Sequence, residues 1–419
     1  AGREAEAHAI FDKWDLDAAV IGKVTDTGRI VLMDRGEKIV DLPIEPLAEG
    51  VRYDRPSKPG PAAPTVRLPA APADLNATLA SLLAAPNIAS RSLVFQQYDH
   101  MVRLGTVRRP GAADAAVVRI LDGATDLVRA KGVALTTDCN PRFCQLDPYE
   151  GAKLAVAEAY RNISTVGAEP LAITDCLNFG SPERPEIMHQ LKEAIRGLGD
   201  ACRALETPVV SGNVSLYNET DGRPIFPSPS VGMVGVISEA RHAVGSWFPA
   251  NLAIALLGDN TDELGGSEYL AFVHGQVAGP VPKLDLEKEA RVGKACRALI
   301  GAQLVVAAHD CSEGGLAVAL AETCFGDPLV GAHVSLDSDI RPDCLLFGEA
   351  PSRILVAYDE SREADVERIA QEQGAPFKRI GRTGGGSLAI EVQGKKVVDA
   401  TVSSLAAAYR GGLAHALGL

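Results

Sequence analysis

The sequence has few aromatic residues, no long apolar run and no zinc-ligand spacing among its cysteines. Aromatic residues make up 5% of the chain, whereas hydrophobic residues make up 46%, with 41 glycines. This balance favours close-packed α/β structure over a β-sandwich. No stretch approaches the roughly 18 apolar residues of a membrane-spanning helix, and no signal peptide is visible. The eight cysteines are typical of reduced thiols in a cytosolic protein.

Basic residues are also in the minority. The net charge of -13 is spread along the chain, which argues against nucleic acid or an anionic membrane as the main partner. The sequence lacks a Walker loop, and no dinucleotide fingerprint follows a strand. Any phosphate ligand must therefore be held locally, by a metal ion and by backbone N–H groups.

An internal repeat links the two ends of the chain. The segment Arg3–Asp41 matches Arg362–Asp399 with one gap, and each copy predicts a helix followed by two strands and the turn between them. Chance similarity between two such units is one reading. The other is a duplicated protein cut inside its first half, with a proline-rich linker after the first copy. The first residue, Ala1 rather than Met, also hints that an upstream part has been removed.

Polar residues are expected at the ends of two neighbouring strands. The strand Pro170–Thr174 ends in Asp175, a helix is expected over about 185–205, and the strand Pro208–Val210 opens into the loop Ser211–Ser215. A right-handed crossover would place both strand ends at one sheet edge, with Asp175 and Asn213 as neighbours. Carboxylate and amide oxygens beside a glycine loop suit magnesium and phosphates. The alternative is that both side chains only cap turns.

Two further clusters are ambiguous. Asp138 and Arg142 could orient a ligand, but an Asn-Pro turn closed by an Asp–Arg pair is the commoner explanation of such a cluster. His309 and Asp310 precede Glu313-Gly314-Gly315, whose glycines could admit phosphate at a helix N-terminus or allow tight packing between domains. Neighbouring strand residues point to opposite faces, so a catalytic His–Asp pair is not expected there. The sequence shows no convincing nucleophile or general base.

Four segments together resemble phosphoribosylformylglycinamidine synthase, a family within the aminoimidazole ribonucleotide synthetase superfamily. The segment Val210–Thr220, Val-Ser-Gly-Asn-Val-Ser-Leu-Tyr-Asn-Glu-Thr, is specific to that family, whereas Asp-x-Ser-x-Gly-Gly-Leu is shared across the superfamily. The other two segments are 136–148 and 173–180. The resemblance implies an α/β fold of tandem A and B domains, the second half of a pseudo-duplicated enzyme. The implied domains are 1–52 as the tail of the first B domain, 53–70 as linker, 71–245 as the second A domain and 246–419 as the second B domain.

The resemblance also implies roles for individual residues. Asp175 and Gly212 correspond to ATP contacts, Asn213 to a Mg²⁺ ligand and Ser215 to a contact with the formylglycinamide substrate. The family's catalytic residues lie in its first half and are expected to be absent from this chain. The roles of Asp310 and Asp138 stay open.

The implied reaction is the ATP-dependent conversion of formylglycinamide ribonucleotide to the amidine, a C–N ligation in purine biosynthesis. Ammonia would come from a separate glutaminase subunit, joined through a small bridging subunit as in the family's short form. Alternatives are a non-catalytic folded half with weak or no nucleotide binding, or another synthetase of the same superfamily.

Overall fold

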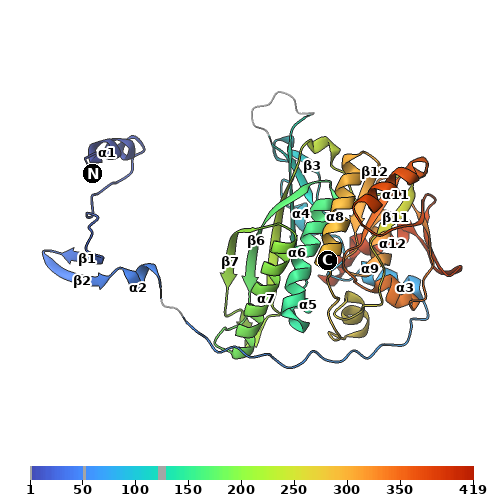
Figure 1. Cartoon of the computed structure of the whole chain (residues 1–419), viewed down its shortest axis with the longest axis horizontal. Coiled ribbons are helices and arrows are strands. Elements are labelled where there is room, and N and C mark those ends of the chain that lie inside the picture. The colour runs from blue at the N-terminus through green and yellow to red at the C-terminus, as the bar shows by residue number, and fades with distance from the viewer. Residues whose placement is uncertain (1, 51–52, 121–128) are drawn as a thin grey trace. The chain divides into compact units, whose positions relative to one another are not determined.

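The computed structural model describes residues 2–50, 53–120 and 129–419 and divides after Arg55 into two compact units. The first unit contains a helix, a two-stranded hairpin and a helical turn (Figure 1). Its elements are α1 (Glu4–Lys13), β1 (Arg29–Asp34), β2 (Glu37–Pro43) and α2 (Glu45–Ala48). No residue in the described part of this unit is buried, so the unit has no hydrophobic core of its own.

The second unit ends with the same arrangement, as the repeat predicts. Here α11 (Glu363–Glu372) is followed by β15 (Phe377–Thr383), β16 (Ser387–Val392), β17 (Lys395–Thr401) and α12 (Val402–Ala416). Both hairpins turn through a pair of left-handed residues, Arg35-Gly36 in the first copy and Gln393-Gly394 in the second, which matches the right-handed twist of paired strands. The match at this level supports duplication over chance similarity.

The copies differ at one strand. In the second copy, β15 lies between β11 (Ala253–Leu257) and β13 (Ala332–Leu336). The corresponding residues 18–24 form no strand. Within the described part of the first unit, only β1 and β2 form a sheet, so this segment has no paired strands to join. Its apolar side chains, including Ile21 and Val24, are consequently exposed.

The first sheet of the second unit has the strand order β3-β4-β5-β10-β6-β7. Strand β6 pairs in parallel with β7 and antiparallel with β10. The strands are β3 (Thr106–Arg108), β4 (Ala116–Arg119), β5 (Gly132–Asp138), β6 (Glu169–Asn178), β7 (Val209–Ser215) and β10 (Ser228–Ile237), and β8 (Glu219–Thr220) and β9 (Arg223–Pro224) form a separate ribbon. The helices are α4 (Ser92–Phe95), η1 (Val102–Leu104), α5 (Pro141–Leu146), α6 (Pro148–Thr165), α7 (Pro185–Ala204) and η2 (Ala240–His242).

Among the described residues, helices cover only one face of this sheet. Apolar side chains of α6 and α7 pack against it and form one core with residues such as Ile173 and Met233. The two long helices lie side by side along β6 and β7 in Figure 1. On the other face, Leu135, Leu171 and Val210 are 49%, 47% and 68% exposed. Covering this face with a partner would contribute about 25 cal/mol of free energy for each Å² of apolar surface removed from water.

The second sheet has the order β12-β14-β11-β15-β13-β16-β17. Its further elements are η3 (Tyr269–Val273), α8 (Leu286–Gly301), β12 (Val305–Asp310), α9 (Gly315–Thr323), α10 (Pro342–Phe347), β14 (Ile354–Tyr358) and η4 (Glu360–Arg362). The early helix α3 (Leu75–Leu83) buries Leu79, Leu82 and Leu83 in the core of this sheet. Thus α3, which comes before the first sheet in sequence, belongs by packing to the second domain.

Candidate functional site

Asp175 and Gly212 lie opposite each other on the parallel strands β6 and β7. A Cβ atom at Gly212 would lie 2.6 Å from Oδ1 of Asp175, so the carboxylate covers the glycine and leaves no room for a larger residue there. Burial raises the pKa of Asp175 above its ordinary value. The parallel pairing confirms the predicted strand–helix–strand crossover. The two residues that resemble ATP contacts are therefore in direct contact.

Asn213 is on the opposite face of the sheet from Asp175. Its backbone pairs with Cys176, and its Nδ2 lies 3.8 Å from Cys176 Sγ. Because successive strand residues alternate between faces, the amide and the Asp175 carboxylate do not converge. The expectation that they form one paired site was wrong for the side chains, although their backbones are neighbours. The spacing of residues in the sequence predicted that the two strand ends lie side by side. It could not predict the register between the strands, which decides the face on which each side chain lies.

Ser215 ends β7 and is held by the loop that follows it. Its Oγ is 3.1 Å from Asn218 Oδ1, while Asn218 Nδ2 donates to the carbonyl oxygens of Phe179 and Ser215. The loops after β6 and β7 are further joined by the Ser181 N–H, which donates to Glu219. The family-specific segment thus fixes the position of Ser215 through hydrogen bonds within its own sequence.

A second group of ionisable residues lies at the contact between the domain of the six-stranded sheet and the domain of the seven-stranded sheet. Burial is the main cause that raises the pKa of Asp138 and of Glu158 well above their ordinary values, and repulsion between the carboxylates adds to it. Burial likewise raises the pKa of Asp310 to about 7. Arg161 lies among these groups, with its Nε 3.6 Å from Asp310 Oδ2. Strong pKa perturbation of this kind is common at functional sites and in buried ion networks alike.

Arg142 does not pair with Asp138 in the way the sequence suggested. Its Nη1 lies 2.7 Å from Glu268 Oε2 and its Nε donates to the carbonyl of Gly266, so it ties α5 to the second domain. The side chain of Asn140 caps α5 by accepting from the N–H groups of residues 142 and 143. The predicted Asn-Pro turn is therefore present, but no Asp–Arg pair closes it.

Asp114, His309 and Asp310 are a group that could hold a metal ion, because their ligand atoms lie within 4.8 Å of one another. In this structure His309 Nδ1 instead contacts Asp114 Oδ1 at 2.6 Å, and the Asp310 N–H donates to Asp114 Oδ2. The neighbouring carboxylates raise the pKa of His309 well above its ordinary value although burial opposes this. Both ring nitrogens of His309 thus face carboxylates, since its Nε2 also lies 3.2 Å from Glu322 Oε2.

The sequence analysis did not identify Asp114, Glu158 and Glu322 as members of these networks. Asp114 is 195 residues from its partner His309, and no local pattern connects the two positions. Glu158 and Arg161 gave a weak signal. They are oppositely charged residues three positions apart on α6, so they lie one helical turn from each other. They also lie at the border of the helix's apolar face, where charged side chains become partly buried.

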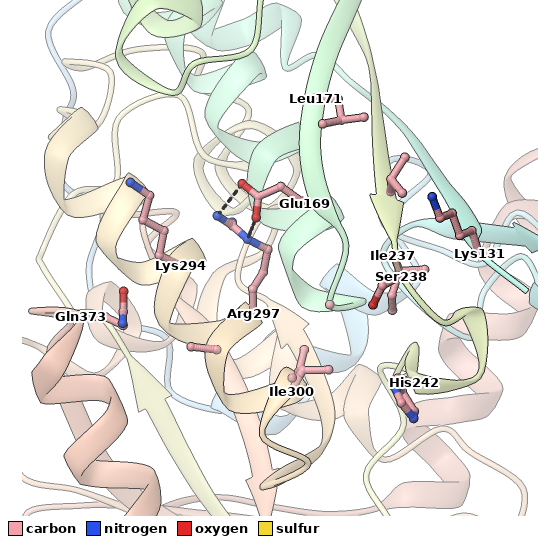
Figure 2. A pocket seen from close by; sticks show the side chains of 14 residues that line it. Lys131, Glu169, Leu171, Ile237, Ser238, His242, Lys294, Arg297, Ile300 and Gln373 are labelled. Atoms are coloured by element: carbon pink, nitrogen blue, oxygen red, sulfur yellow. Dashed lines mark hydrogen bonds and ion pairs between the residues drawn. The ribbon is translucent and has the colours of Figure 1, made fainter. Parts of the chain in front are cut away.

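A cavity of about 840 Å³ lies at the opposite end of β6 from Asp175. Figure 2 shows Lys294 and Arg297 on α8, with Arg297 paired to Glu169, and Lys131 on the other side of the cavity. None of Asp175, Gly212, Asn213 and Ser215 lines it. This cavity is therefore separate from the strand ends that carry the family-specific segment. No described helix is long and apolar enough to cross a membrane.

Comparison with known proteins identifies two domains. The family model for "AIR synthase related protein, N-terminal domain" matches residues 112–237, and that for the C-terminal domain matches residues 250–393. The chain is 50% identical over 428 residues to the phosphoribosylformylglycinamidine synthase subunit PurL of Anaeromyxobacter dehalogenans, covering 98% of this chain and 56% of the relative. For PurL of Thermomicrobium roseum the identity is 46%, over 97% of this chain and 55% of the relative. The chain thus spans about half the length of the curated relatives it matches.

Solved structures show the same likeness. Thermotoga maritima PurL complexed with ATP matches with a TM-score of 0.57 and 26% identity, over 91% of this chain and 53% of that chain. The structure of PurLQS from Thermotoga maritima matches with the same values. These matches confirm the predicted fold class of two α/β domains in tandem.

Proposed function

Because the chain belongs to the AIR synthase related family, we propose that it is the second A and B domain pair of a phosphoribosylformylglycinamidine synthase. The observation that carries the proposal is 50% identity to a PurL subunit over 98% of the chain. On this proposal residues 1–52 are the end of a first B domain and 53–70 a linker. Residues 71–245 and 246–419 are the second A and B domains, with α3 packing in the core of the latter.

The proposed reaction is a ligation that forms a C–N bond. ATP phosphorylates the amide oxygen of formylglycinamide ribonucleotide, and ammonia then displaces phosphate to give the amidine. Such a step needs neutralisation of charge on the transferred phosphoryl group and exclusion of water. The attacking nucleophile of this reaction is ammonia itself, so we assign the residues at the ends of β6 and β7 a binding role.

Asp175 and Gly212 are the proposed ATP contacts. Because the Asp175 carboxylate fills the space beside the Gly212 Cα, a ligand at this position would meet the carboxylate and the glycine together. The side chains of Asn213 and Ser215 lie on the opposite face of β7 from Asp175. We propose that Asn213 ligates Mg²⁺ there and that Ser215 contacts the substrate. Mg²⁺ would supply charge neutralisation at the phosphates. Since the two pairs lie on opposite faces of β7, the proposed site wraps around the edge of the sheet.

The proposed partners are the enzyme's first half, a glutaminase subunit and a small bridging subunit, in the cytoplasm. The first of these is supported by the open face of the six-stranded sheet, where Leu135, Leu171 and Val210 are exposed. An equivalent A domain would cover these side chains with a matching face. The likeness to the PurLQS structure supports an assembly with further subunits.

Magnesium-dependent ATP binding by the purified chain, measured by calorimetry, tests the proposal. We expect binding that Asp175→Ala, Asn213→Ala and Gly212→Ala each weaken about tenfold or more. The first two remove a ligand contact, and the third displaces the Asp175 carboxylate. Asp337→Ala is the matched control, because Asp337 is an exposed carboxylate in the other domain. We expect it to bind ATP like the unaltered chain.

Two other outcomes of the ATP-binding measurement would contradict the proposal. Binding that survives all three substitutions would place the nucleotide elsewhere and refute the residue assignment. A chain that folds but binds no ATP would favour the alternative of a folded half without a usable nucleotide site.

A further inference from the structure

A cavity of about 350 Å³ lies in the second unit, away from the strand ends discussed above. Its walls carry the aromatic side chains of Phe95, Trp247, Phe325 and Tyr409. Phe325 and Tyr409 contact each other with ring centroids 5.2 Å apart. The cavity is within the usual size range of small-molecule sites, and aromatic walls with a few polar groups are typical of such sites.

The polar side of this cavity is an ionic triad. His309 lies between two carboxylates, with Nδ1 2.6 Å from Asp114 Oδ1 and Nε2 3.2 Å from Glu322 Oε2. Asp114 is almost fully buried, whereas the Glu322 side chain is 25% exposed. Among the described residues no hydrogen bond uses Oε1 of Glu322. The triad therefore presents one anionic acceptor to the cavity, in a position fixed by His309.

A cationic donor lies on another wall. The Nη2 of Arg410 donates to the carbonyl of Phe325 at 3.1 Å, which anchors the guanidinium beside the aromatic pair. A guanidinium has five donors in a planar fork, and within residues 2–50, 53–120 and 129–419 the other N–H groups of Arg410 form no hydrogen bond. The residues that line the cavity include one guanidinium and no lysine. The cavity thus offers an acceptor, a donor fork and flat apolar walls, without the cations that a triphosphate needs.

We propose that this cavity binds the base of a guanine-type nucleoside. The guanine ring is flat and stacks on aromatic side chains. Its N1–H and 2-amino groups donate, which suits the free oxygen of Glu322, and its O6 and N7 accept from an arginine fork. A nucleoside would occupy the cavity, whereas the phosphates of a nucleotide would find no lysine there.

Tryptophan fluorescence tests this proposal on the chain itself. The sequence contains two tryptophans, so a Trp14→Phe background leaves Trp247 in the cavity wall as the only reporter. We expect guanosine to quench this signal saturably. Inosine, which lacks the 2-amino group, should bind about tenfold or more weakly because one charged hydrogen bond is lost.

Two variants and a matched control locate the site. Glu322→Gln and Arg410→Met should each weaken guanosine binding about tenfold or more, with thermal melts to establish that both remain folded. Glu391→Gln removes a similar Glu–His contact, 3.4 Å from His333 Nε2, outside the cavity and should bind normally. The proposal is overturned if guanosine gives no saturable signal at millimolar concentration, if inosine binds equally, or if neither variant alters the affinity. Competition by ATP for the same signal would also overturn it.

Discussion

Replacing Arg161 by Met should lower the free energy of unfolding by about 3–5 kcal/mol, because it leaves buried carboxylates without their cation. Arg161 is 2% exposed, and its Nη1 lies 3.1 Å from Glu289 Oε1. Its other nitrogens lie 3.6 Å from Glu158 and Asp310. Methionine fills much of the same volume, so the loss would come mainly from charge and hydrogen bonding rather than from a cavity.

Urea unfolding followed by circular dichroism measures this effect. Arg368→Met is the control, since Arg368 is exposed and forms a surface pair with Glu372, so we expect a change of about 1 kcal/mol or less. The slope of free energy against urea should stay the same in both variants. A loss below about 1 kcal/mol for Arg161→Met would mean that the carboxylates take up protons and no longer need the guanidinium.

The same network explains how the two domains of the second unit hold together. Arg161 and Glu158 come from α6, whereas Glu289 and Asp310 come from the second domain's α8 and β12. Glu289 also accepts a hydrogen bond from Ser352 Oγ at 2.6 Å. Arg297 on α8 adds a second connection, since its Nη1 donates to Ser164 and its Nε pairs with Glu169. The domain contact therefore combines a buried ion network with apolar packing, as of Phe143 and Leu154 against Val281 and Leu284.

The sequence predicted the parts of the fold that depend on local pattern. The helix expected over about 185–205 is α7 (Pro185–Ala204), and the strands expected over Pro170–Thr174 and Pro208–Val210 lie in β6 and at the start of β7. The repeat was visible because both hairpins use the same turn geometry, which only certain residue pairs adopt. Periodicity and turn chemistry act over a few residues, so one sequence suffices to read them.

Interactions between distant segments were not predictable in this way. The side chains of Asp175 and Asn213 lie on opposite faces because of the register between β6 and β7, and a shift of one residue would have reversed this. The Asp114–His309 contact joins different domains. The packing of α3 against the second sheet also depends on tertiary contacts. Register and domain packing are set by the whole core rather than by neighbouring residues.

Glu349→Gln should make stability less dependent on pH, because burial raises the pKa of the Glu349 carboxyl in the folded chain. Its Oε1 accepts from the N–H groups of Glu268 and Gly314, at 2.7 and 2.8 Å, while Oε2 has no hydrogen-bond partner. Burial, with repulsion from Glu313, raises its pKa to about 8, from an ordinary value of 4.5. Glutamine keeps the accepting oxygen and carries no charge at any pH.

The sign of the effect follows from proton binding. Between pH 4.5 and about 8 the folded chain holds a proton on Glu349 that the unfolded chain has released. Stability therefore falls as pH rises through this window, by about 1.4 kcal/mol per unit for this group. The Asp310 carboxyl, with a pKa of about 7, adds a fall in the same direction, and this term is common to the chain and the variant.

Urea unfolding at intervals between pH 5 and 8 would measure the difference between the chain and Glu349→Gln. We expect the variant to gain stability relative to the unaltered chain as pH rises and to be the more stable of the two at pH 8. Glu287→Gln is the control, since the Glu287 side chain is 91% exposed and should give a parallel pH profile. If Glu349→Gln also runs parallel to the unaltered chain, then Glu349 is ionised when folded, and Arg142 must compensate its charge.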